Sequence, residues 1–140
     1  MGLTSSKFIS AHKRPVLDYE MAINFTAINN PNYLVNAMCD VSDGLISELK
    51  HIADASKVSI KLDSKLISEA PGFSELSDLA AELKVDVWQW ILSGGEDHVF
   101  VATTCVKIPE GAIVIGVVES DLGVTVQGLP DLKSEGFKHF

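Results

Sequence analysis

One strand-to-helix turn constrains the fold of this chain more than any other stretch. A largely apolar run meets two carboxylates, Asp40 and Asp43, three positions apart. Apolar side chains then recur at helical spacing from Leu45 to Ala53, which is typical of a helix with one buried face. We therefore expect a strand that ends at Asp40 and a helix that begins at Asp43.

The side chains of this turn offer two kinds of ligand chemistry. Ser42 is a good helix N-cap, because its hydroxyl oxygen can accept a first-turn amide hydrogen, and the helix dipole favours negative charge at Asp43. Carboxylate oxygens suit hard cations such as Mg²⁺, while the amides at a helix start suit phosphate. Capping needs one polar side chain, and the second carboxylate, Asp40, brings repulsion that a bound cation would remove. On this turn alone, a structural cap and a metal site explain the residues equally well.

Composition limits the classes of partner. The chain has 140 residues, enough for one domain that buries about two-thirds of its unfolded surface. Its formal charge of −8 disfavours binding to nucleic acid or to an anionic membrane. It has neither an apolar stretch long enough to span a bilayer nor an N-terminal signal core. Cys39 and Cys105 lack zinc or disulfide spacing, so we expect both to be buried thiols of a cytoplasmic protein.

Strand and helix patterns alternate in the first half of the chain, and strand patterns dominate the second half. We expect strands at 34–40, 57–62, 98–103, 112–118 and 124–127, helices at 43–55, 74–84 and 86–92, a helical turn at 65–70, and a short helix or strand at 20–27. This order predicts an α+β domain with helices packed on a mixed β-sheet. Residues 1–30 are interpreted as a lead-in or interdomain segment, and 31–140 as the domain.

A second motif, Ser93-Gly-Gly-Glu-Asp97, stands between a predicted helix and a predicted strand. Glycines allow positive φ and the close approach of a ligand, and successive amides in such a turn can bind an anion. A plain helix C-cap would need only one glycine. The second glycine and the two acids that follow it favour a ligand site, in which Glu96 is a better candidate contact than Asp97. Near the C-terminus, Phe137 by itself suggests only an aromatic tucked against the edge of the core.

Three motifs together resemble a known family. The stretches Asp40-Val-Ser-Asp-Gly-Leu45, Ser93-Gly-Gly-Glu-Asp97 and Gly136-Phe-Lys-His-Phe140 match, in order and spacing, the C-terminal half of the thiamine-monophosphate kinase family. This family belongs to the wider superfamily of aminoimidazole-ribonucleotide synthetase. Looser forms of the first motif occur across the superfamily, whereas the second selects the thiamine kinases. The resemblance implies the fold of the aminoimidazole-ribonucleotide synthetase C-terminal domain.

The resemblance also implies an activity, the ATP-dependent phosphorylation of thiamine monophosphate to thiamine diphosphate with Mg²⁺. By position, Asp40 and Asp43 would hold Mg²⁺ and Ser42 would contact ATP. Glu96 would contact the thiamine phosphate, and Phe137 would pack on its rings. No catalytic residue is assigned, because a phosphate dianion is already a nucleophile and needs no general base.

Members of this family carry a further N-terminal domain with more metal-binding carboxylates and much of the dimer contact. The resemblance therefore implies that this chain is a fragment that folds but is not a competent kinase alone, and that the full-length protein is a homodimer. Two alternatives stay open. The chain could be a non-catalytic module that binds a nucleotide or a partner, or part of a sibling enzyme that makes a different acyl phosphate or iminophosphate.

Overall fold

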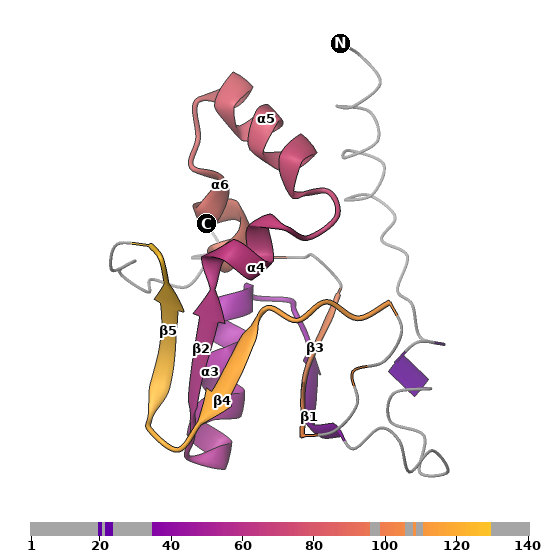
Figure 1. Cartoon of the computed structure of the whole chain (residues 1–140), viewed down its shortest axis with the longest axis vertical. Helices are drawn as coiled ribbons and strands as arrows, with labels where there is room; N and C mark the ends of the chain where they lie inside the picture. Colours follow the sequence, from indigo (N-terminus) through magenta and orange to yellow (C-terminus); the bar gives the residue numbers. More distant parts are fainter. Residues whose placement is uncertain are drawn as a thin grey trace.

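The structure is a computed structural model that describes residues 35–95, 99–105 and 111–129, together with positions 20, 22, 23 and 108. Helical backbone is present at the three described positions of the predicted segment 20–27. The remaining elements appear in Figure 1 and are, in chain order, β1 (Val35–Asp40), α3 (Leu45–Ser56), β2 (Ser59–Asp63), α4 (Ser64–Ser68), α5 (Phe73–Leu83), α6 (Val87–Ser93), β3 (Phe100–Thr104), β4 (Gly116–Glu119) and β5 (Gly123–Gln127).

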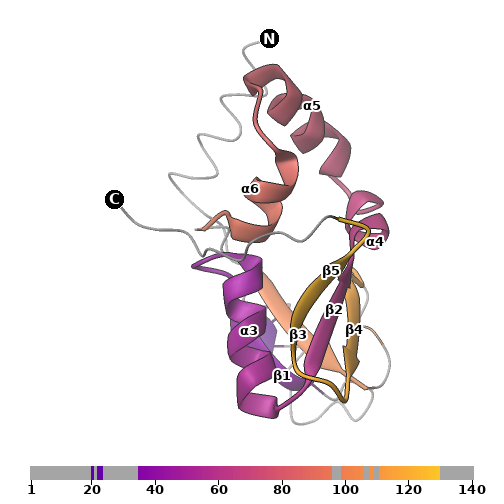
Figure 2. The same cartoon turned by 90° about the vertical axis from the view of Figure 1, so that its left-hand side faces the viewer.

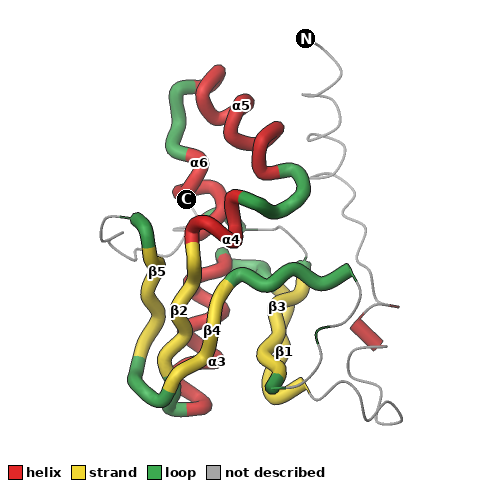
Figure 3. The backbone as a smooth tube through the Cα atoms, in the orientation of Figure 1, coloured by secondary structure: helices red, strands yellow, loops and turns green. Residues whose placement is uncertain are grey.

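The described strands form two sheets (Figure 3). β1 and β3 pair antiparallel, in a register that sets Asp40 opposite Phe100. The other sheet has the order β4-β2-β5, in which the central strand is antiparallel to β4 and parallel to β5. The predicted α+β class with a mixed sheet is confirmed. Its division into two sheets was not predicted.

Helix α3 organises the core. It contacts β2 and β5 as well as β1, and Figures 1 and 2 show it along one face of the three-stranded sheet, with the β1–β3 pair beside it. Its apolar face is buried as the spacing predicted. Burial of such side chains is the main favourable contribution to folding. The buried core consists of Val41, Leu49, Ile52, Ala53, Ile60, Leu62, Ile67, Leu92 and Val101.

Helices α4, α5 and α6 form a helical arm beyond one end of the sheets (Figures 1 and 2). Asp63 and Asp86 are the N-caps of α4 and α6, because each carboxylate accepts a hydrogen bond from a backbone amide in the first turn of the helix that follows it. The rings of Phe73 and Trp88, with centroids 5.4 Å apart, join α5 to α6. Helix α6 in turn contacts α3, and α5 lies farthest from the sheets in both views (Figures 1 and 2). The arm therefore fixes the position of residues 93–95, which follow α6.

Most predicted element boundaries are shifted by one or two residues from the observed ones. Lys57 adopts the left-handed conformation at the end of α3, so β2 begins only at Ser59. The strand predicted at 112–118 shortens to Gly116–Glu119, and Ile113 and Val114 are exposed instead. Across the described residues, no helix has the length and hydropathy needed to cross a bilayer.

Candidate functional site

The turn after β1 presents its two carboxylates to solvent. Asp40 ends the strand as predicted, and both Asp40 and Asp43 are exposed. Between them Val41 is buried at 2% exposure, and its amide donates to the carbonyl oxygen of Val99 at 2.8 Å. This bond continues the β1–β3 pairing by one residue past the strand. The turn is thus anchored by a buried side chain and by backbone pairing, while its acids face outward.

Ser42 does not cap α3, contrary to the sequence prediction. The helix begins at Leu45 rather than at Asp43, and its N-cap is Gly44, with φ 103° and ψ 146° and no side-chain cap. Only glycine adopts such angles without strain, so the chain turns there and carries the Ser42 hydroxyl away from the capping position. The N-cap residue therefore has no side chain that could accept a hydrogen bond from the first turn of α3, and helix N-termini favour a bound phosphate.

The two central motifs meet backbone to backbone at a glycine junction formed by Gly44, Gly94 and Gly95. A Cβ on Gly95 would lie 2.8 Å from the carbonyl oxygen of Ser42, and a Cβ on Gly44 would lie 3.1 Å from the carbonyl carbon of Ser93. A Cβ on Gly94 would lie 2.2 Å from the carbonyl oxygen of Trp90. A side chain at Gly44 or Gly95 would separate the two turns, whereas one at Gly94 would collide with the end of α6.

The positive φ expected at the double glycine is not found. Gly94 has φ −65°, and among described residues neither Gly94 nor Gly95 has positive φ. Both positions leave no room for a Cβ, and the group nearest to Gly95 is the backbone of the Ser42 turn. Two segments about fifty residues apart in the sequence therefore form one site.

Glu96 and Phe137 both lie outside the described residues. The described part of the candidate site therefore consists of Asp40, Ser42 and Asp43 with the glycine junction.

The donor set of the turn fits Mg²⁺. Within the described part of the chain, no three His, Cys, Asp or Glu side chains gather closely enough to hold a metal ion by themselves. Mg²⁺ is usually held by only one or two carboxylates, with phosphate oxygens and waters completing its shell. The exposed carboxylates of Asp40 and Asp43, in the turn that leads into α3, meet that requirement. This arrangement would hold the metal together with a phosphorylated ligand better than the metal alone.

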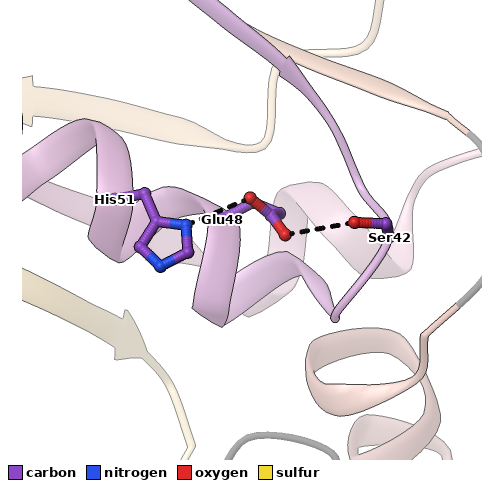
Figure 4. Close-up of polar contacts among 3 residues, drawn as sticks. All are labelled: Ser42, Glu48 and His51. Carbon is purple, nitrogen blue, oxygen red and sulfur yellow. Dashed lines mark hydrogen bonds and ion pairs between the residues drawn. The ribbon is translucent and has the colours of Figure 1, made fainter.

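Behind the turn lies a buried carboxylate that sequence reasoning missed. Glu48, 8% exposed, accepts a hydrogen bond from Ser42 Oγ at 3.5 Å. Its other oxygen lies 3.3 Å from Nδ1 of His51, a largely exposed side chain (Figure 4). The sequence did indicate this burial, because Glu48 falls within the apolar face of α3, three residues after Leu45 and four before Ile52.

The two cysteines differ from each other, and the prediction that both are buried is wrong. Cys105 is exposed because it follows the last residue of β3, where pairing with β1 has ended. Cys39 is half-buried in β1. Burial, then the negative charges of Glu48 and Asp40, raise the pKa of the Cys39 thiol.

This difference predicts unequal alkylation near neutral pH. The thiolate is the reactive form, so a raised pKa and partial burial should make Cys39 react several-fold more slowly with iodoacetamide than Cys105. Mass spectrometry of peptides from timed samples measures both rates in one experiment, and Cys105→Ser should remove only the fast phase. Equal rates would contradict the described environments of the two thiols.

The sequence also matches a family model, described as AIR synthase related protein, C-terminal domain, over residues 5–128. The chain belongs to this family. The match includes the turn at 40–44 and the glycine junction, so both are features of a family domain. It also confirms the fold inferred from the motifs.

Curated relatives narrow the resemblance to one kind of protein. A thiamine-monophosphate kinase of Corynebacterium glutamicum is 39% identical over 136 residues, which cover 94% of this chain and 38% of that protein. Another, from Mycobacterium tuberculosis, is 44% identical over 93 residues, which cover 66% of this chain and 27% of that protein. The chain thus spans less than half the length of these relatives.

Solved structures agree with this resemblance. One described as AaThiL complexed with AMPPCP and TMP superposes with a TM-score of 0.80 at 27% identity, covering all of this chain and 43% of that one. The thiamine monophosphate kinase of Aquifex aeolicus superposes with a TM-score of 0.74 at 26% identity, covering 91% of this chain and 41% of that one. The resemblance to the C-terminal part of thiamine-monophosphate kinases, stated from three motifs, is confirmed.

Proposed function

We propose that this chain supplies the C-terminal, ligand-binding part of an ATP- and Mg²⁺-dependent kinase that converts thiamine monophosphate to thiamine diphosphate. The observation that carries the proposal is the glycine junction, which joins the acidic turn at 40–44 to the Ser93-Gly-Gly-Glu-Asp97 motif. A phosphoryl transfer site needs metal-binding oxygens and a substrate-binding segment side by side, and this junction supports that arrangement. Kinase relatives and a neighbour complexed with AMPPCP support the choice of reaction.

The residues of the turn would act by position and charge. Asp40 and Asp43 would hold Mg²⁺ against the phosphates of ATP, and Ser42 would contact the Mg·ATP complex. The amides at the start of α3 would receive a phosphate oxygen. Bound Mg²⁺ would neutralise part of the negative charge on the transferred phosphoryl group. Glu96 would contact the phosphate of the accepting substrate, and Phe137 would pack on its rings.

Most of the catalytic effect in such a site comes from holding the donor and acceptor phosphates in line while their repulsion is screened. The acceptor phosphate is itself the nucleophile, so no side chain needs to remove a proton. Accordingly, no member of the site is assigned as a general base. The division into a lead-in at 1–30 and a domain at 31–140, a homodimeric full-length protein and a cytoplasmic location belong to the same proposal.

A chimera tests the proposed activity. This chain replaces the segment that it matches in the Corynebacterium glutamicum relative, and thiamine diphosphate is quantified after incubation with ATP, Mg²⁺ and thiamine monophosphate. The 140-residue chain alone is the control and is expected to give no product. Product from the chimera supports the proposal. A folded chimera that binds nucleotide without turnover would favour a non-catalytic module, and preference for another phosphate acceptor in competition would favour a sibling enzyme.

A further inference from the structure

Glu48 is a buried carboxylate to which the proposed mechanism gives no role. Glutamate is rarely buried unless it is paired, because removing a carboxylate from water is unfavourable. On α3 it lies next to Leu49, whose side chain is 2% exposed. An apolar residue at position 48 would extend the core-facing stripe of this helix. The position therefore needs an explanation other than packing.

One of the described partners of Glu48, Ser42, belongs to the candidate site. Figure 4 shows the carboxylate between Ser42, in the turn, and His51, one helical turn further along α3. The contact with His51 engages one oxygen and leaves the other directed at Ser42. The 3.5 Å separation from Ser42 Oγ exceeds the range of about 2.5–3.0 Å usual for O–H···O hydrogen bonds, and long hydrogen bonds of this kind are common in active sites before a ligand tightens them.

The direction of this hydrogen bond has a chemical consequence. A serine hydroxyl has one proton to donate and two lone pairs that accept. Ser42 donates its proton to Glu48, so only lone pairs remain for a ligand. A phosphate oxygen is itself an acceptor and is a poor partner for such a hydroxyl, whereas a divalent cation or a water bound to it is a good one.

We propose that Glu48 is a positioning residue that holds the Ser42 hydroxyl as an acceptor, so that Ser42 Oγ faces a hydrated divalent cation rather than a phosphate oxygen of the nucleotide. This inference rests on the proposed function, in which the same turn binds Mg²⁺. Glu48, a buried residue of α3, would thereby become part of the site. Ser42 would contact the cation of the Mg·ATP complex rather than its phosphates.

A purely structural role for Glu48 makes a different prediction. An acidic side chain in the first turn of a helix stabilises it through the helix dipole, and Glu48 is in that turn. In that case its replacement would change thermal stability and leave the metal affinity of the turn unaltered. The two roles can therefore be separated by measuring the Mg²⁺ affinity of the turn in variants of Glu48.

The test compares Glu48→Gln with Glu48→Leu in the 140-residue chain, with amide NMR during titration by MgCl₂ alone. Both variants lose the charge, but only glutamine keeps an oxygen that can accept the Ser42 proton. Wild type should show shifts of the amides at 40–44 that saturate with Mg²⁺. We expect Glu48→Leu to need about fivefold more Mg²⁺ than Glu48→Gln, as loss of one hydrogen bond predicts. Asp54→Asn, which removes an exposed charge of α3, is the matched control and should behave as wild type.

A second comparison makes the test specific to Ser42. In a Ser42→Ala background, Glu48→Gln and Glu48→Leu should have equal Mg²⁺ affinities, because the hydroxyl on which they differ is gone. Equal affinities of the two Glu48 variants with Ser42 present, alongside a wild-type turn that responds to Mg²⁺, would overturn this inference alone. A wild-type turn that responds to Mg²⁺ neither alone nor with AMPPCP present would overturn the metal site of the proposed function and this inference with it.

Discussion

Replacing Asp43 with asparagine is expected to lower kcat/KM of the chimera for Mg·ATP by about 100-fold or more, the usual effect of removing one charge-stabilising group from an active site. Asparagine keeps the size of the side chain and removes the charge that would hold Mg²⁺ against the phosphates. Because Asp43 is exposed, its replacement should leave the fold intact. Steady-state kinetics with ATP and thiamine monophosphate varied separately measure the effect.

Two controls make the Asp43 experiment decisive. Asp54→Asn removes an exposed carboxylate from the same helix region and should retain full turnover. Thermal melting of both variants should match the parent chimera, which would exclude unfolding as the cause of lost activity. Full turnover by the Asp43→Asn chimera would remove this residue from the site and leave the acidic turn without its proposed role.

Replacing Gly95 with alanine is expected to disrupt the glycine junction. The added methyl group would lie 2.8 Å from the carbonyl oxygen of Ser42, closer than real Cβ atoms approach backbone, so one of the two turns must move. Overpacking of this kind usually costs about 1–3 kcal/mol. We expect a loss of that size in the free energy of unfolding, measured with urea, together with loss of the Mg²⁺ response of the amides at 40–44.

Gly116→Ala is the matched control for this prediction. Its Cβ would lie 2.2 Å from the carbonyl oxygen of Lys61, so it also forces backbone apart, but between β4 and β2. It should destabilise the chain and still leave the Mg²⁺ response at 40–44 intact in the folded fraction. If Gly95→Ala left both stability and the metal response unchanged, the two motifs would not be coupled by their backbones.

Much of the fold could be predicted from local patterns. The end of β1 at Asp40, the apolar face of α3 and the start of α6 after Asp86 each follow from residues that are close in sequence. Periodicity reports which side of an element is buried, and that holds for Leu49 and its neighbours. The split into two sheets could not be predicted, because strand pairing depends on contacts between distant segments.

The residue types of the site could be predicted from the sequence, but their arrangement in space could not. Asp40 and Asp43 were correctly expected at one exposed turn. The N-cap assignment of Ser42 was wrong because propensity does not reveal that Gly44 turns the chain before the helix starts. The contact between Gly95 and the carbonyl of Ser42 could not be predicted because the two residues are distant in sequence. Glu48 was overlooked because its burial becomes visible only once α3 is packed.

The central claim is that the turn at 40–44 binds a metal with nucleotide phosphate beside the glycine junction. Its most direct test is anomalous diffraction from Mn²⁺ in crystals of the chimera grown with AMPPCP. We predict a peak at about 2.0–2.3 Å from carboxylate oxygens of Asp40 and Asp43, as expected for a small hard cation, with phosphate oxygens completing its shell. A fully occupied nucleotide whose metals contact neither Asp40 nor Asp43 would contradict the account.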